Sequence, residues 1–123
     1  MSNVQHTITD SEYSIMKILW GSENKMTVSD VVKALDGNDW TPSTVSTFLQ
    51  RLLKKNVVSC EKKGNTNLYY PILKQNDYDM SETESFLSKI YKGSVKNLVA
   101  ALYENKKLSK EDMSELKSMF DLE

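Results

Sequence analysis

The chain has 123 residues, of which 39% are hydrophobic and 27% charged, with a formal net charge of −1. This length excludes two large domains but allows one compact domain or a small domain with an appendage. No apolar run approaches the roughly 18 residues that a membrane-spanning helix needs. The first ten residues lack a secretory signal, so we expect a cytoplasmic protein. The single cysteine, Cys60, excludes an intrachain disulfide.

Charge is distributed unevenly along the chain. Residues 1–40 hold six acidic and three basic residues, residues 41–76 hold one and six, and residues 77–123 hold ten and seven. The middle of the chain is therefore basic between two acidic flanks. Such a distribution is typical of a face that meets nucleic-acid phosphates, and a solvated lysine face would give the same count.

Two short helices are predicted first, each after a capping signal. Thr9 and Glu12 form the pattern of a capping box, and apolar residues then recur at helical spacing up to Gly21. A second signal at Thr27 opens a segment that is apolar at positions i, i+3, i+4 and i+7. The sequence "DGND" ends this second helix.

The clearest predicted helix covers residues 41–55, where Thr41 can cap the N-terminus and Pro42 occupies the first helical position. One side of it is apolar and predicts core: Val45, Phe48, Leu49, Leu52 and Leu53. The other side carries hydroxyls, an amide and cations: Ser43, Thr44, Thr47, Gln50, Arg51 and Lys54. What this polar side contacts is the central question that the sequence raises.

A β-hairpin is predicted next, with strands over residues 57–61 and 68–72 around a turn rich in Lys, Gly and Asn. Pro71 indicates that the second strand ends there or lies at an edge. Three helices followed by a hairpin within about 75 residues are typical of a winged helix-turn-helix. In that fold, the polar side of residues 41–55 enters the DNA major groove.

Three more amphipathic helices are expected after residue 77. The first is expected to begin with a capping box of Ser81 and Glu84 and to break at Gly93, the second to cover residues 94–105, and the third to begin at Ser109. Helices this short bury little alone, so we expect a homodimerisation module, with a helical cap on the first domain as the alternative.

The predicted fold class is thus mainly α with a small β-hairpin wing. We expect an N-terminal winged helix-turn-helix DNA-binding domain over residues 1–75 and a C-terminal three-helix dimerisation domain over residues 76–123. Catalysis is not expected, because one histidine and one cysteine form no nucleophile–base constellation, and the same two residues cannot complete a tetrahedral metal site. We expect no cofactor.

Several segments in order also carry a family resemblance. They are "ITDSEYSIMKILW" (8–20), "DWTPSTVSTFLQRLLKKNVV" (39–58), "LYYPIL" (68–73), "FLSKIYKGSVKNLVAAL" (86–102) and "LSKEDMSELKSMF" (108–120). Together they resemble the penicillinase repressor family over essentially the whole chain. The resemblance implies a dimeric transcriptional repressor that binds an inverted-repeat operator in double-stranded DNA, in one branch controlling antibiotic resistance.

In that antibiotic branch, the resemblance also implies release by a sensor protease that cuts the dimerisation domain. The family typically has Asn-Phe at the scissile bond, whereas the matching position here is Ala101-Leu102. A copper-responsive branch instead uses paired C-terminal cysteines, which this chain lacks. The inducing signal is therefore open. Ser43 and Ser46 stand where the antibiotic branch usually offers Lys and Arg, which predicts a different operator or more reliance on phosphate contacts and DNA shape.

The sequence thus gives two sets of candidate residues. Those expected to contact DNA are Thr41, Ser43, Thr44, Ser46, Thr47, Arg51, Lys54, Lys62, Lys63 and Asn65, with Tyr69 as a weaker phosphate candidate that could instead pack inward. Those expected at the dimer interface are Phe86, Ile90, Leu98, Val99, Leu102, Leu116 and Phe120. The alternative function is a protein–protein interaction module, since winged helices also serve as scaffolds.

Overall fold

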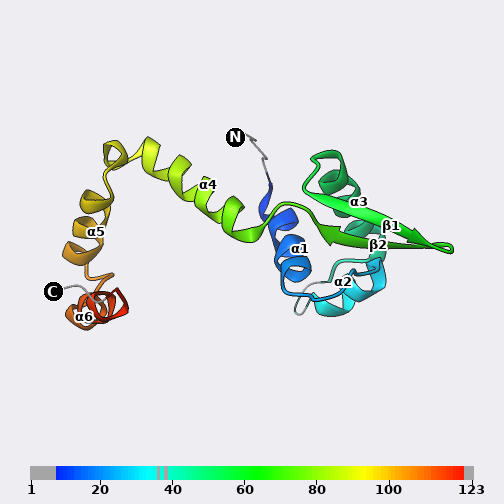
Figure 1. The fold of residues 1–123 in the computed structure, drawn as a ribbon, viewed down its shortest axis with the longest axis horizontal. Helices are drawn as coiled ribbons and strands as arrows, with labels where there is room; N and C mark the ends of the chain where they lie inside the picture. The colour runs from blue at the N-terminus through cyan, green and yellow to red at the C-terminus, as the bar shows by residue number, and fades with distance from the viewer. Residues whose placement is uncertain (1–7, 36, 38, 121–123) are drawn as a thin grey trace. The chain divides into compact units, whose positions relative to one another are not determined.

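The computed structural model describes residues 8–35, 37 and 39–120. The chain divides into two compact units, Met1–Tyr78 and Asp79–Glu123. Three helices and a two-stranded hairpin build the first unit, and helices build the second (Figure 1). This mainly helical architecture with one antiparallel hairpin confirms the predicted fold class.

The first two helices begin where the capping patterns predict. α1 covers Asp10–Trp20, with the Thr9 hydroxyl accepting from the Glu12 N–H at 3.2 Å and the Glu12 carboxylate accepting from the Thr9 N–H at 3.0 Å. α2 covers Val28–Ala34 and opens with the same reciprocal pair between Thr27 and Asp30, at 3.0 and 3.1 Å. These bonds satisfy N–H groups that have no partner inside the helix.

α3 covers Pro42–Lys54, with Thr41 as its N-cap and Lys55 as its C-cap. Its apolar stripe faces inward: Val45, Leu49 and Leu52 are fully buried, and Phe48 and Leu53 are partly buried against the core. The predicted helix and its buried side are confirmed.

The hairpin consists of β1 (Val58–Lys63) and β2 (Thr66–Pro71), paired antiparallel so that Cys60 lies opposite Tyr69. Pro71 is the last residue of β2, as predicted, because proline cannot donate to a further ladder bond. Gly64 in the turn has a φ of +65°, a conformation that favours glycine. Met26 pairs with the outer edge of β2, exchanging two backbone hydrogen bonds of 2.9 and 2.7 Å with Tyr69.

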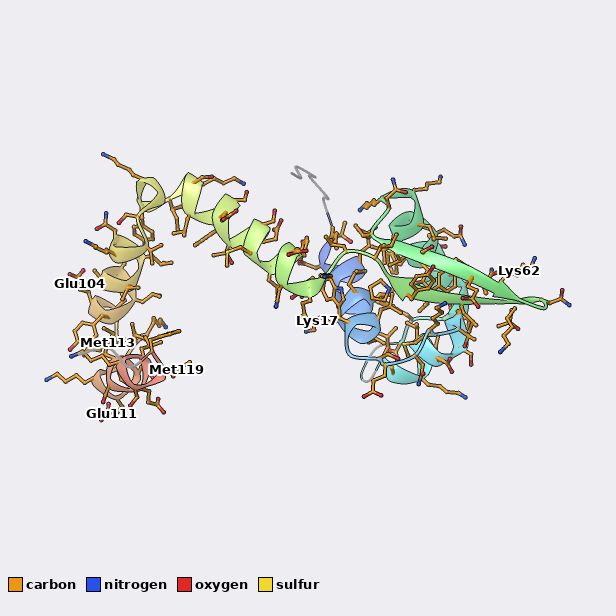
Figure 2. The ribbon with its side chains drawn as sticks, in the orientation of Figure 1. Lys17, Lys62, Glu104, Glu111, Met113 and Met119 are labelled. Carbon is orange, nitrogen blue, oxygen red and sulfur yellow. The ribbon has the colours of Figure 1, made fainter. Side chains whose placement is uncertain are left out.

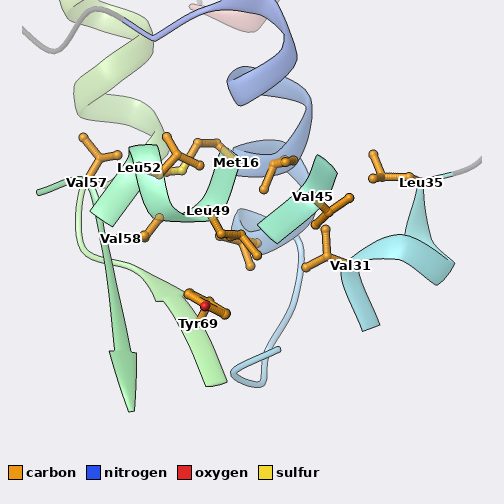
Figure 3. Packing of buried hydrophobic residues seen from close by; sticks show 11 residues of the cluster. Met16, Val31, Leu35, Val45, Leu49, Leu52, Val57, Val58 and Tyr69 are labelled. Carbon is orange, nitrogen blue, oxygen red and sulfur yellow. The ribbon is translucent and has the colours of Figure 1, made fainter. Parts of the chain in front are cut away.

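The core of the first unit lies between its three helices and the hairpin (Figure 3). Its buried side chains come from every element of the unit: Ile15, Met16, Leu19, Val31, Leu35, Val45, Leu49, Leu52, Val57, Val58 and Tyr69. Trp20 packs at the edge of this cluster, and its indole N–H donates to the Leu73 carbonyl at 2.8 Å. The core therefore holds α3 on its apolar side and leaves the opposite side to solvent.

α4 covers Gln75–Lys89, so the predicted start at Ser81 is wrong. Ser81 lies inside the helix and cannot be its cap. Tyr78, only 9% exposed, packs against the rings of Tyr13 and Trp20 on α1, with centroids 5.8 and 6.1 Å away. This tertiary contact, which the local pattern of residues 81–84 does not contain, orders the helix from Gln75 onward.

α4 ends at Lys89, before the predicted break at Gly93, whereas the starts of the last two helices follow the prediction. α4 is followed by a 3₁₀ turn, η1 (Tyr91–Gly93), in which Gly93 has a φ of +75°. α5 (Val95–Glu104) is capped by Ser94, and α6 (Lys110–Met119) opens with a capping box of Ser109 and Asp112. Neither α5 nor α6 has a fully buried residue. None of the helices in the described residues is long and apolar enough to span a bilayer.

Candidate nucleic-acid interface

The polar side of α3 is a row of accessible side chains. Ser43, Thr47 and Arg51 are exposed and lie four residues apart, so they follow one another along the helix surface. Thr41 and Lys54 are also exposed, whereas Thr44 and Ser46 are half-buried. The structure therefore brings all the α3 candidates to one end or one side of a helix whose opposite side is fixed in the core.

The N-terminus of α3 is ordered by its own hydroxyls. Thr41 Oγ1 accepts from the Thr44 N–H at 3.2 Å and lies 3.2 Å from Thr44 Oγ1. Other N–H groups of the first turn have no partner within the helix, and a helix N-terminus favours an anion. One turn further on, the Thr47 hydroxyl donates to the Ser43 carbonyl at 3.1 Å. This end of the helix suits a phosphate, with Thr41 acting through its cap.

Two packed aromatic rings restrain the side chain of Arg51. Its guanidinium carbon lies 5.7 Å from the centre of the Phe48 ring, and that ring packs on Trp40 with centroids 5.1 Å apart. A cation over an aromatic face is attracted by the ring quadrupole. The arginine is thus restrained while still exposed, which lowers the entropy that it would lose on binding a phosphate or a guanine.

The hairpin carries the second group of candidates, Lys62, Lys63 and Asn65, all exposed at or near its turn. Figure 2 shows Lys62 on this hairpin. Glu61, the acidic residue of the basic segment, forms an ion pair with Lys25. The hydrogen bond from Lys25, followed by its charge, lowers the pKa of Glu61. Lys25 also lies 4.5 Å from the centre of the Tyr70 ring. Lys25, which lies in the acidic N-terminal segment, thus neutralises the negative charge of Glu61 beside the wing lysines.

Tyr69 is not a phosphate ligand. The side chain is 1% exposed and belongs to the core, and its backbone pairs with Met26 on the edge of β2 that faces away from β1. Its hydroxyl lies 3.3 Å from Gln50 Nε2, which donates to it. Tyr69 therefore connects the wing to α3 and acts as a structural residue.

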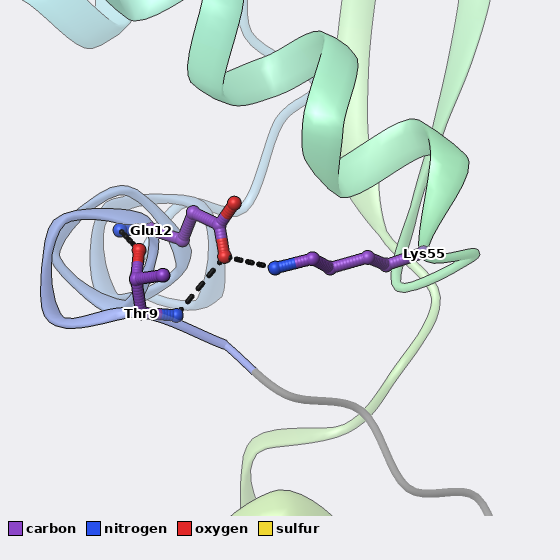
Figure 4. A network of polar contacts seen from close by, with 3 residues as sticks. All are labelled: Thr9, Glu12 and Lys55. Atoms are coloured by element: carbon purple, nitrogen blue, oxygen red, sulfur yellow. Dashed lines mark hydrogen bonds and ion pairs between the residues drawn. The ribbon is translucent and has the colours of Figure 1, made fainter.

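A partly buried ion pair, which the sequence did not predict, joins α1 to the end of α3 (Figure 4). Lys55 Nζ lies 2.5 Å from Glu12 Oε1, and the Glu12 residue is 1% exposed. Burial alone would raise the pKa of Glu12, but hydrogen bonds from Lys55 and the Thr9 N–H outweigh it and lower the pKa. The charge of Lys55 is thus paired with a carboxylate of the same chain.

Comparison with known proteins assigns the family. The sequence model described as penicillinase repressor matches residues 8–121. This chain belongs to the penicillinase repressor family. The family is one of DNA-binding transcriptional repressors, which is not an enzyme class.

Individual members of the penicillinase repressor family are similar over most of their length. The penicillinase repressor of Bacillus licheniformis is 34% identical over 110 residues, 89% of this chain and 85% of that protein. The methicillin resistance regulatory protein MecI of Staphylococcus aureus is 26% identical over 98% of both chains. A solved structure is also similar: the solution structure of monomeric Bacillus licheniformis BlaI in complex with the blaP half-operator. Its sequence is 32% identical to this chain, and the structures superpose with a TM-score of 0.52. The match covers 63% of this chain and 94% of that chain.

The residues predicted at the dimer interface lie on the three C-terminal helices or at their ends. Phe86, Leu102, Leu116 and Phe120 are 53%, 38%, 37% and 64% exposed. Ile90, Leu98 and Val99 are half-buried. Within the described residues, none of these seven apolar side chains is fully buried.

The bond that matches the family cleavage position lies inside a helix. Ala101 is half-buried and Leu102 exposed, and both belong to α5.

Cys60, half-buried on β1, packs against the core and not fully within it. Across the described residues, no three His, Cys, Asp or Glu side chains come together in a group that could hold a metal ion.

Proposed function

We propose that this protein is a dimeric, sequence-specific repressor that binds an inverted-repeat operator through two copies of its N-terminal unit. The exposed row of Ser43, Thr47 and Arg51 on α3 carries the proposal. Because the core fixes the apolar side of the helix, these side chains project as a rigid set, which suits insertion into a major groove about 12 Å wide. Hydroxyls and an arginine match base edges and phosphates.

Contacts divide by chemistry between the two DNA-facing elements. Ser43, Thr44, Ser46 and Thr47 read base edges, and Arg51 and Lys54 contact the groove edge or the backbone. The first turn of α3 binds a phosphate at the N-terminus capped by Thr41. On the wing, Lys62, Lys63 and Asn65 contact phosphates and add affinity without sequence preference.

The C-terminal helices form the dimer in this proposal. Residues 76–123 act as the dimerisation domain. Support comes from apolar residues that are exposed or only half-buried in the single chain: Phe86, Ile90, Leu98, Val99, Leu102, Leu116 and Phe120. Leaving this many apolar groups in water is unfavourable, and a second copy would bury them.

Release by proteolysis, where it occurs, requires α5 to open. Proteases bind their substrates as extended chains, and Ala101-Leu102 is helical. A sensor protease that cuts this bond would need local unwinding of α5 and would have to accept Ala-Leu where the antibiotic branch has Asn-Phe. Incubating the full chain with the candidate protease and mapping the products by mass spectrometry tests this step.

Operator binding is tested on the full chain in two stages. A selection from random duplexes, followed by anisotropy titrations at several salt concentrations, measures preference for the selected operator over an unrelated duplex. Thr44→Ala with Thr47→Ala should lower this preference more than it lowers binding to the unrelated duplex. A matched control, Thr83→Ala on α4, should change neither. Equal affinity of the wild type for both duplexes would favour the protein-interaction alternative.

Dimerisation is tested by sedimentation velocity. Leu98→Asp should shift the full chain from dimer to monomer, because it places a charge among the apolar groups of the interface. Lys106→Asp, on the exposed end of the α5–α6 connection, should leave the dimer intact. A persistent Leu98→Asp dimer with unchanged affinity would remove Leu98 from the interface.

A further inference from the structure

Thr47 has an unusual position among the hydroxyl residues of α3. It lies in the middle of the exposed row, with Ser43 one turn before it and Arg51 one turn after it. Its hydroxyl donates to the Ser43 backbone carbonyl at 3.1 Å. A carbonyl oxygen only accepts, so the direction of this bond is fixed and the one hydroxyl proton of Thr47 is directed into the helix.

The bond decides what Thr47 can offer to DNA. Its hydroxyl cannot donate to a base acceptor such as guanine O6 while its proton remains on the Ser43 carbonyl. The same bond holds Oγ1 against the preceding turn of the helix. The other branch on Cβ, the methyl group, takes no part in this bond and is the group that Thr47 can offer to DNA. In the major groove, the group that matches a methyl is the C5-methyl of thymine, which other base pairs do not present.

We infer that Thr47 is a specificity-determining residue that reads a thymine through contact between its side-chain methyl and the thymine methyl. The inference rests on the proposed operator binding and adds to it the chemical identity of one base. Arg51, restrained over the Phe48 ring one turn away, supplies the charged contact beside it. Thr47 would contact a base through its methyl group, and Arg51, on the next turn of α3, would contact DNA through its charge.

Deoxyuridine substitution tests the contact directly, because it removes the thymine methyl and leaves both hydrogen-bonding edges intact. Each thymine in a half-site of the selected operator is replaced in turn, and the affinity of the full chain is measured by anisotropy. We expect one position at which the wild type binds about fourfold more weakly, the value of one methyl group withdrawn from an apolar contact.

Two variants then assign that methyl to Thr47. Thr47→Val keeps a branched methyl and removes the hydroxyl, so it should bind the thymine operator within about twofold of wild type and keep the deoxyuridine penalty. Thr47→Ser keeps the hydroxyl and removes the methyl, so it should bind the thymine operator about fourfold more weakly and show no further loss with deoxyuridine.

A matched control separates these effects from changes in helix stability. Thr83 on α4 is exposed, and its hydroxyl donates to the Asp79 carbonyl at 2.8 Å in the same i to i−4 pattern. Thr83→Val and Thr83→Ser should leave operator affinity and the deoxyuridine penalty unchanged.

Three results would overturn the inference. Thr47→Val binding as weakly as Thr47→Ser would assign the reading to the hydroxyl. A deoxyuridine penalty that persists in Thr47→Ser would assign the methyl contact to another residue, and specific binding with no penalty at any thymine would exclude methyl reading. Failure of the wild type to prefer any selected duplex is a distinct result, because it rejects the proposed operator binding together with this inference.

Discussion

Replacing Glu12 with Gln should destabilise the N-terminal unit through one defined contact. The substitution is nearly isosteric, and glutamine still serves as the N3 residue of the capping box with Thr9. What it removes is the charge that faces Lys55 Nζ at 2.5 Å. Because the Glu12 side chain is 1% exposed and that of Lys55 is 30% exposed, the pair is shielded on one side only.

The expected loss is about 2 kcal/mol of unfolding free energy. A hydrogen bond to a charged group contributes about 1.5–3 kcal/mol, and the partial exposure of Lys55 lets water compensate for some of it. Lys55→Met keeps most of the side-chain length and removes the charge. In a double-mutant cycle, Glu12→Gln and Lys55→Met should show a coupling of about 1–2 kcal/mol.

Urea unfolding followed by tryptophan fluorescence measures this in the full chain. Both tryptophans, Trp20 and Trp40, belong to the first unit, so the signal reports on that unit. Glu61→Gln is the matched control, because its ion pair with Lys25 is 43% and 49% exposed and should matter less. Additive effects of Glu12→Gln and Lys55→Met, or an equal loss in Glu61→Gln, would refute the argument.

The same variant gives a pH dependence whose sign follows from the lowered pKa of Glu12. A carboxyl with a folded-state pKa below its ordinary 4.5 contributes stability above that value and loses it as the pH falls through the folded-state pKa. The difference between wild type and Glu12→Gln should therefore be full at pH 7 and shrink below pH 4.5. A difference that stays constant down to pH 3 would contradict an ionised Glu12.

Three other predictions concern the core, the wing and the start of α4. Leu52→Ala should lower the unfolding free energy by about 2–5 kcal/mol in the urea assay, because Leu52 is fully buried. Lys63→Ala should flatten the salt slope of operator binding by about one unit, whereas Lys110→Ala on α6 should not change it. Tyr78→Ala should speed amide hydrogen exchange in the first turn of α4 and shift the Trp20 emission, and Phe86→Ala should do neither.

The features that the sequence predicts well are those determined within a few residues. The capping boxes at Thr9 and Thr27 and the single cap at Thr41 mark the starts of α1, α2 and α3, because each is a contact between residues three positions apart. The buried side of α3 also follows from the 3.6-residue period alone. These local signals suffice for the order of elements that defines the fold.

The features that the sequence could not predict depend on contacts between distant residues. α4 begins at Gln75 because Tyr78 packs on α1, although the local pattern favoured a start at Ser81. In β2, alternation alone does not decide which tyrosine points inward. Packing against buried residues of the helices takes up Tyr69, whereas Tyr70 stays half-buried beside Lys25.

Charge counting illustrates the same difference between composition and geometry. Residues 41–76 hold one acidic and six basic residues, yet one base and the acid both have partners outside the segment. Lys55 forms an ion pair with Glu12 on α1, which neutralises one positive charge of the segment. Glu61 is paired by Lys25, which compensates the negative charge there. One pairing neutralises a positive charge of the segment and the other neutralises a negative charge, so the net charge of the segment is unchanged. The composition of residues 41–76 does not reveal this cancellation, because both partners lie outside the segment. The cations that we propose to contact phosphate are those that α3 and the wing expose, and their number follows from these two pairings as much as from the lysine count.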